Sequence, residues 1–147
     1  SPMSRGLGDV YKRQIKTAKI KNGWKVVKNW QGTGKGRVRK HDAGIDYMET
    51  VTPGSELAVE FSGTAIGLPM VAGPDVGIIE WKIDDGEWKS LDQFTKWSRS
   101  LHIPWIYMLE KQLPKGKHLL TLRTTARKNE QSKGYACRFS SFAVNGN

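Results

Sequence analysis

The chain has 147 residues, 37% of them hydrophobic and 26% charged, and its formal net charge is +10. This length suits one ordinary domain, and no apolar run approaches the roughly 18 residues of a membrane-spanning helix. A single cysteine excludes an internal disulfide framework and a multi-cysteine metal site.

Residues 1–14, SPMSRGLGDVYKRQ, show neither the period of a helix nor that of a strand. The stretch GLGDVYKRQ resembles a translated sequencing adapter at the end of a metagenomic fragment. We therefore predict a non-native or disordered leader over 1–14, a single domain over 15–147, and a natural protein that continues upstream.

The segment 15–40 contains nine lysines and arginines and no acidic residue. Such a run either attracts nucleic acid, anionic glycans or anionic lipid, or is a solvated face. Residues 31–44 are rich in glycine and lysine and predict a loop. Its His41 lies beside Asp42 and near Asp46, but this spacing matches no metal motif, and polar surface is the simpler interpretation.

Alternation of apolar and polar residues predicts strands at 57–61, 79–83 and 118–122. Turn signals separate them, including Asp84-Asp85-Gly86, because Asp and Gly tolerate left-handed backbone angles. No amphipathic helix is evident. The pattern predicts an all-β, jelly-roll-like single β-sandwich of about seven to nine antiparallel strands.

The segment 91–109 is the least regular part of the chain. Because Pro104 cannot donate a ladder hydrogen bond, we predict a short helical turn or loop followed by a strand from about Trp105. Near the C-terminus, the apolar phase changes between 137–139 and 142–144, which indicates a bulge or a strand buried on both faces. Cys137 is expected to be a small buried hydrophobe.

The motifs of common catalytic sites are missing from the sequence: there is no G-x-S-x-G, H-E-x-x-H, Walker loop or G-x-G-x-x-G. The acidic residues Asp84, Asp85 and Glu87 share one predicted turn and suit turn formation better than a catalytic pair. His102 suits either proton transfer or a buried hydrogen bond, and His118 suits a capping or cross-strand hydrogen bond. We predict no catalytic residue in this chain and no resident metal or cofactor; structural calcium is possible, but nothing in the sequence indicates it.

Six tryptophans make the aromatic set the most informative feature of the sequence. Trp24 and Trp81 fall in strand patterns and are expected in the core. Trp88, Trp97 and Trp105 fall in or beside loops, where an indole ring can stack on the C–H face of a sugar. The same rings could instead cap the sandwich or fill a domain interface. Nucleic-acid stacking is disfavoured because the basic run and these rings lie apart in sequence.

Six blocks of the sequence, in this order, resemble an accessory β-sandwich domain at the C-terminal side of bacterial SGNH/GDSL-type esterases that act on polysaccharides. The resemblance covers about residues 20–146. The blocks are AIGL (65–68), AGPDVGIIEWKIDDG (72–86), LDQFTKWS (91–98), LHIPW (101–105), LPKGKHLLTLR (113–123) and SKGYACRFSSFAVNG (132–146).

The resemblance implies a non-catalytic module that binds a polysaccharide or oligosaccharide and sits beside an upstream esterase catalytic domain. The nucleophilic serine of such esterases follows Gly-Asp, whereas Gly8-Asp9 is followed here by Val10. The alternative is a structural domain that docks on the catalytic domain and has no ligand of its own. The resemblance also implies secretion or a periplasmic location, with neither nucleic acid nor membrane as a partner. The predicted carbohydrate-binding residues are Trp97, Trp105, Trp88, Asp75, Arg99 and His102.

Overall fold

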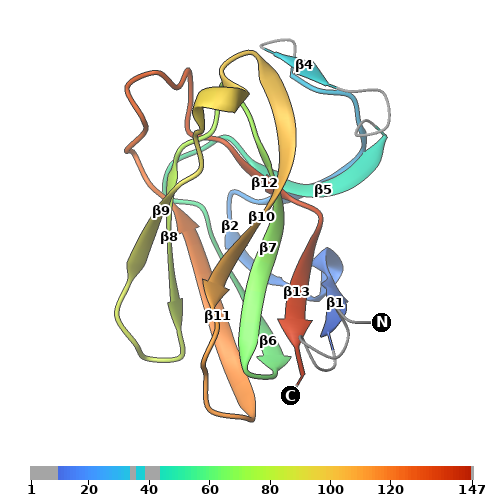
Figure 1. Cartoon of the computed structure of the whole chain (residues 1–147), viewed down its shortest axis with the longest axis vertical. Coiled ribbons are helices and arrows are strands. Elements are labelled where there is room, and N and C mark those ends of the chain that lie inside the picture. The colour runs from blue at the N-terminus through green and yellow to red at the C-terminus, as the bar shows by residue number, and fades with distance from the viewer. Residues whose placement is uncertain (1–9, 34–35, 39–43, 147) are drawn as a thin grey trace.

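The chain forms two packed β-sheets (Figure 1). The computed structural model describes residues 10–33, 36–38 and 44–146. The eight-stranded sheet contains β1 (Val10–Gln14), β3 (Lys25–Trp30), β4 (Arg37–Val38), β5 (Ile45–Thr50), β7 (Ala65–Ala72), β10 (Leu101–Glu110), β12 (Cys137–Phe139) and β13 (Ser141–Asn145). The five-stranded sheet contains β2 (Lys19–Asn22), β6 (Glu56–Ser62), β8 (Ile78–Ile83), β9 (Lys89–Asp92) and β11 (Lys117–Thr124). Short 3-10 helices are η1 (Ile15–Thr17) and η3 (Lys96–Ser98).

The all-β sandwich predicted from the sequence is confirmed. The three alternating segments form β6, β8 and β11, which are antiparallel neighbours in the order β6-β11-β8. The described residues contain thirteen strands, more than the predicted seven to nine. Several of the additional strands are only two to five residues long, too short to show alternation. The pairing is antiparallel except between β4 and β10, which run parallel.

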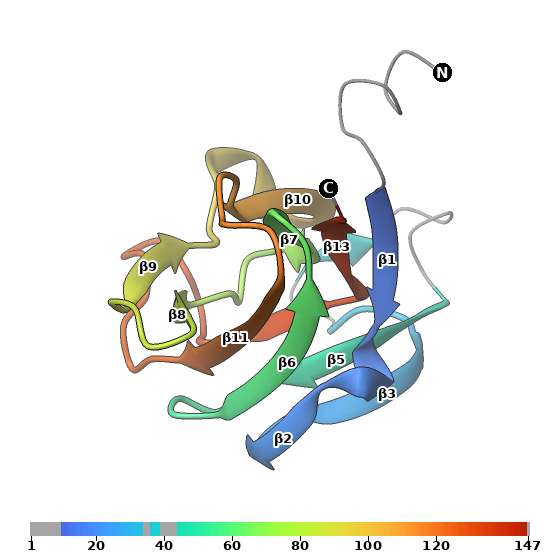
Figure 2. The same cartoon turned by 90° about the horizontal axis from the view of Figure 1, so that it is seen from below.

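The main core lies between the two sheets (Figure 2). Alternate residues of each strand point inward, and each fully buried large apolar side chain contributes about 1.5–3 kcal/mol of transfer free energy. Strands β6, β7 and β11 supply many of the side chains of this core: Leu57, Val59 and Phe61 of β6, Ile66, Leu68 and Met70 of β7, and Leu120 and Leu122 of β11. Trp24 and Trp81 are buried in this core, as predicted, and so is Cys137. No helix in the described part of the chain is long and apolar enough to cross a membrane.

The N-terminal boundary of the fold differs from the prediction. Val10–Gln14 forms β1 and pairs with β13 over five residues, from Val10 opposite Asn145 to Gln14 opposite Ser141. The Tyr11 hydroxyl also donates a hydrogen bond to the Ser62 carbonyl at 2.8 Å. Backbone pairing does not require an alternating sequence, which is why the pattern did not indicate this strand. The described fold therefore begins before residue 15; residues 1–9 lie outside the described part.

The eight-stranded sheet divides at Ser140. On one side of this residue, β12 leads to β5 and β3; on the other side, β13 leads to β1. Ser140 donates its N–H to the Pro69 carbonyl of β7 at 2.9 Å. In an antiparallel ladder, the N–H and C=O of one residue face the same neighbouring strand. Pro69 has no N–H, so it cannot donate a hydrogen bond to the chain at Ser140, where the sheet divides. Of the two predicted alternatives, a bulge or a strand buried on both faces, the second describes β12, whose three residues are all buried, and the phase change itself is a break between two strands.

Strand β10 begins at Leu101 and includes Pro104, whereas we predicted a strand only from about Trp105. Pro104 is tolerated because β10 pairs with β7 on one side from Ile103 onward, while its pairing with β4 covers only Leu101 and His102. At Pro104 the strand is thus an edge strand, where a missing donor costs little.

The turn at Asp84-Asp85-Gly86 is tied to the end of the next hairpin. Asp84 has a positive φ of 52°, and its carboxylate accepts hydrogen bonds from His118 Nδ1 at 2.7 Å and from the Leu119 N–H at 2.8 Å. His118 Nε2 lies 2.6 Å from the Pro114 carbonyl. The hydrogen bonds of His118 to Asp84 and to the Pro114 carbonyl raise the pKa of His118, and the bond from His118 lowers the pKa of Asp84. The prediction that His118 makes a capping or cross-strand hydrogen bond is confirmed.

This pairing predicts a defined pH dependence of stability. Because the pKa of His118 is raised on folding, the contribution of His118 to the stability of the fold is complete at pH values below the ordinary pKa of histidine. This contribution is lost as pH rises through the raised pKa. Because the pKa of Asp84 is lowered, its contribution disappears as pH falls through the lowered value. As pH rises from about 6.5, the ordinary pKa of histidine, through the raised pKa of His118, we expect the urea midpoint of the unsubstituted chain to fall relative to that of His118→Gln. Parallel midpoint curves for the two proteins would show that His118 is not linked to folding.

Candidate functional site

Two tryptophan rings stand out from the surface on consecutive elements. Trp97 in η3 is 64% exposed, and Trp105 in β10 is 46% exposed. The Lys96 ammonium lies 4.6 Å from the centre of the Trp97 ring, and the Tyr107 ring lies 6.3 Å from that of Trp105. Large aromatic rings are usually buried, so two exposed rings on neighbouring elements indicate a contact surface for a ligand or partner.

The backbone under these rings is fixed by local hydrogen bonds. Thr95 and Ser98 form a capping box around η3, and Ser98 is fully buried. The Tyr107 hydroxyl donates to the Gln93 carbonyl at 3.0 Å, and burial followed by the charge of Asp92 raises the pKa of Tyr107 to about 12. Tyr107 therefore stays neutral at ordinary pH, and the segment 93–107 presents its tryptophans on a supported frame.

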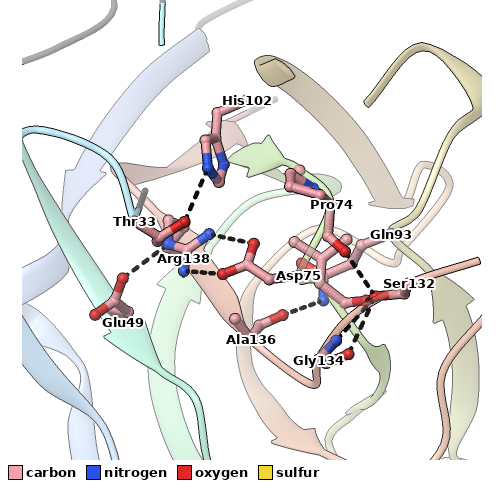
Figure 3. A network of polar contacts seen from close by, with 12 residues as sticks. Thr33, Glu49, Pro74, Asp75, Gln93, His102, Ser132, Gly134, Ala136 and Arg138 are labelled. Atoms are coloured by element: carbon pink, nitrogen blue, oxygen red, sulfur yellow. Dashed lines mark hydrogen bonds and ion pairs between the residues drawn. The ribbon is translucent and has the colours of Figure 1, made fainter. Parts of the chain in front are cut away.

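A second support lies behind the surface, in the loop between β7 and β8. Gln93 Nε2 donates to the carbonyls of Gly77 at 2.9 Å and Ala136 at 3.1 Å. The Ser132 hydroxyl lies 2.6 Å from the Val76 carbonyl and 3.3 Å from the Pro74 carbonyl (Figure 3). These side chains satisfy backbone groups that are buried away from a ladder, and they hold the loop that carries Asp75.

A buried ion network surrounds Arg138 of β12 (Figure 3). Its guanidinium contacts both Asp75 oxygens, at 3.2 and 3.0 Å, and donates from Nε to Glu49 at 2.8 Å. Burial alone would raise the pKa of Asp75, but the hydrogen bonds and charge of Arg138 outweigh it, and the pKa lies below its usual value. Arg138 thus links β12, β5 and the loop after β7 through largely buried charged pairs.

His102 lies beside this network and is 1% exposed. Its Nε2 is 3.1 Å from the Thr33 hydroxyl, its ring centre lies 5.1 Å from that of Trp30 with the two rings nearly perpendicular, and its buried Nδ1 has no hydrogen-bond partner among the described residues. Burial lowers the pKa of His102 despite the nearby Asp75 carboxylate, so the ring is neutral at pH 7. Of the two roles that the sequence left open, the position of His102 matches the buried structural one.

Trp30, Tyr47 and Val71 form a second, smaller apolar cluster, separate from the main core. The Arg138 guanidinium carbon lies 5.3 Å from the centre of the Trp30 ring, and Trp30 meets Tyr47 edge-on at 5.4 Å. Short strand β4, from the predicted loop 31–44, pairs with the start of β10 and brings Val38 against this cluster. The cluster and the ion network therefore anchor the beginning of the strand that carries Trp105.

The six predicted site residues do not share one surface. Trp97, Trp105 and Arg99 are exposed on the η3–β10 segment, whereas Asp75 and His102 are buried beneath it. Trp88 lies elsewhere, before β9, where the Arg123 guanidinium stacks 3.6 Å from its ring centre and the Lys82 ammonium lies at 5.0 Å. One face of Trp88 is therefore already covered. No described residue set forms a group of three or more potential metal ligands, and His41 and Asp42 lie outside the described residues.

Sequence reasoning missed Arg138, Glu49 and Thr33, which complete the buried network. Arg138 lies between the core residues Cys137 and Phe139, so strand alternation placed it on the opposite face, where an arginine normally meets solvent. Its partner Asp75 is 63 positions away in the sequence, and no local pattern reports such a pair. Cys137 itself is inert, since burial raises the pKa of its thiol.

Comparisons with known proteins indicate the fold. No protein-family model matches the sequence, and no curated protein is significantly similar to it. A two-domain esterase (CEX) active on acetylated mannans, crystallised with mannopentaose, matches with a TM-score of 0.66 and 13% identity, over 92% of this chain and 36% of the esterase. This chain thus spans about a third of that protein.

Two separate domains match over nearly their whole length. A family 35 carbohydrate binding module from Clostridium thermocellum has a TM-score of 0.55 and 13% identity, over 93% of this chain and 98% of that one. The CBM36-1 domain of a multidomain xylanase from the hindgut metagenome of Trinervitermes trinervoides has a TM-score of 0.53 and 12% identity, over 95% and 98%. At these identities the comparison shows a shared β-sandwich fold.

Proposed function

We propose that this domain is a non-catalytic carbohydrate-binding module that positions a polysaccharide for an esterase catalytic domain of the SGNH/GDSL type. The observation that carries the proposal is the pair of exposed indole rings, Trp97 and Trp105, on the supported η3–β10 segment. A flat, weakly hydrated ring held by a rigid frame gives up little conformational entropy when it stacks on a sugar.

The polar residues around the rings have two separate roles in this proposal. Arg99 is exposed beside Trp97 and can donate hydrogen bonds to sugar hydroxyls. Asp75 and His102 are buried and act from beneath by holding the backbone that carries the rings. Trp88 is outside the binding surface because its ring is stacked with Arg123.

The fold comparisons support this proposal from a different direction. The sandwich is shared with two carbohydrate binding modules and with part of an esterase active on acetylated mannans. Fold likeness alone leaves the ligand open, so the exposed rings carry the assignment. A secreted or periplasmic location belongs to the same proposal.

Removing the two rings tests the assignment. Affinity electrophoresis of the 147-residue chain in gels containing acetylated mannan, deacetylated mannan, xylan or β-glucan should show retardation by at least one neutral glycan. We expect Trp97→Ala and Trp105→Ala each to weaken that retardation about tenfold, because base–aromatic stacking contributes roughly 1–3 kcal/mol per base and we take the same order for a sugar ring. Raising the salt concentration should leave the retardation unchanged.

Trp88→Ala is the matched control, since it removes an indole whose face is already covered, and circular dichroism checks the fold of all three variants. Equal loss of binding in Trp88→Ala would place the site elsewhere. Unaltered migration in every neutral glycan would overturn the carbohydrate-binding role and leave docking on a catalytic domain as the use of the exposed rings.

A further inference from the structure

A groove opens where the eight-stranded sheet divides at Ser140. Its volume is about 640 Å³, within the usual range of ligand sites. One wall is formed by β1 and η1, and the other by β3 and β5; β1 and β5 lie well apart in Figure 1. Ser140 and Ser141 line the bottom of the groove, at the step opposite Pro69. We call this hollow the fork groove; it is separate from the Trp97 and Trp105 surface.

The walls of the fork groove carry more positive than negative charge. Lys12, Lys16 and Lys28 line it, and Asp46 is the one acidic residue among its described lining residues. Asp46 already accepts a hydrogen bond from the Asn29 N–H at 2.8 Å. This bond supports the irregular backbone of β3, where Asn29 has a positive φ of 54°. Within the described part of the chain, none of the three lysines forms an ion pair, so their ammonium groups face solvent.

The groove also offers an apolar surface. Val26 of β3 is 43% exposed, and the Ile15 side chain, which is packed into the core, lines the same hollow. Ser140 and Ser141 add hydroxyl groups that donate and accept hydrogen bonds. An apolar wall, two hydroxyls and an excess of ammonium groups suit a ligand that has C–H faces, hydroxyls and regularly spaced negative charges. No aromatic residue is among the described residues that line the groove, so this part of the wall lacks the ring that nucleobase stacking requires.

We propose that the fork groove is a second binding site, specific for a carboxylated polysaccharide such as a polyuronate. The ammonium groups of Lys16 and Lys28 contact carboxylates, and Val26 packs against a sugar ring. The choice of a polysaccharide rests on the proposed function, whereas the preference for negative charge rests on the groove itself. Lys12 lies in the segment that resembles an adapter, and the test therefore uses Lys16 and Lys28.

The double substitution Lys16→Glu/Lys28→Glu tests this site in the full 147-residue chain. Affinity electrophoresis in polygalacturonate at low salt should show retardation that weakens as salt increases, because the contacts are charge–charge contacts in water. We expect the double variant to bind polygalacturonate at least about tenfold more weakly, since it loses two exposed ion contacts and each charge reversal adds repulsion. Lys16→Gln/Lys28→Gln, which removes charge without adding repulsion, should show a smaller loss.

Lys115→Glu/Lys133→Glu is the control, because it changes the net charge equally at two exposed lysines outside the groove. An equal loss in this control, or equally salt-sensitive binding to DNA, would reduce the effect to net charge and overturn the site. Trp97→Ala separates the two proposals. Polygalacturonate binding that persists in Trp97→Ala and is lost in Lys16→Glu/Lys28→Glu supports the fork groove, whatever happens to neutral glycans. Loss in Trp97→Ala alone would overturn the fork groove and leave one site.

Discussion

Replacing Arg138 by methionine is expected to lower the free energy of unfolding by about 3–5 kcal/mol. The guanidinium is fully buried and binds Asp75 at two atoms and Glu49 at one. Methionine fills similar space but leaves the Asp75 carboxylate in the interior without its cation, so the pKa of Asp75 must rise above its present low value. The lost charge pairing, more than the lost volume, sets the size of the effect.

Urea unfolding followed by tryptophan fluorescence measures this loss. Arg123→Met is the matched control, since Arg123 also pairs with a glutamate, Glu80 at 2.8 Å, but is 36% exposed and should cost no more than about 1 kcal/mol for that pair. Should Arg138→Met fail to fold, Arg138→Lys takes its place. Lysine keeps the charge but cannot contact Asp75 and Glu49 together, so the stability of Arg138→Lys should lie between that of the unsubstituted protein and that of Arg138→Met. Similar small losses at both arginines would mean that the buried network does not stabilise the fold.

The strand pattern and the core were predictable because they depend on local alternation. In β6, β8 and β11 one face meets the opposing sheet and the other meets solvent, so residues such as Leu57 and Leu122 indicate the core directly. The exposed tryptophans were also within reach, since Trp97 and Trp105 lie in the irregular segment 91–109, which Pro104 interrupts. The same reasoning could not predict β1, whose side chains contribute little to burial and which is joined to β13 through the backbone.

The roles of Asp75 and His102 depend on long-range pairing, and local sequence could not supply it. Both lie near the predicted site in sequence, and polar residues near exposed tryptophans suggest direct ligand contacts. In the fold, Arg138 arrives from β12 to bind Asp75, and Thr33 arrives from the end of β3 to meet His102. The second apolar cluster around Trp30 then buries the histidine. A polar residue that contacts a ligand at the surface and a polar residue that supports the site from beneath can therefore look the same in the local sequence.

Substituting Gly73, which lies against His102, is expected to show how strongly the buried support of the tryptophan surface contributes to stability. A Cβ on Gly73 would lie 2.3 Å from His102 Nδ1 and 2.8 Å from its Cε1. The ring has little room to move, because Thr33 holds Nε2 and Trp30 packs against its face. We expect Gly73→Ala to destabilise the protein by about 1–3 kcal/mol, which outweighs the roughly 0.4–1 kcal/mol gained from a stiffer unfolded chain.

A double-mutant cycle with His102→Ala identifies the cause. Removing the imidazole removes the clash, so Gly73→Ala should cost much less in the His102→Ala background, with a coupling energy of about 0.5–3 kcal/mol. Equal costs in both backgrounds would show that Gly73 is required for another reason, such as the 3.3 Å that would separate the same Cβ from Asp75 Oδ1. His102 begins the strand that carries Trp105, so a displaced ring should also weaken retardation by neutral glycans in Gly73→Ala. Parallel loss of stability and of glycan binding would show that the buried network positions the exposed tryptophans.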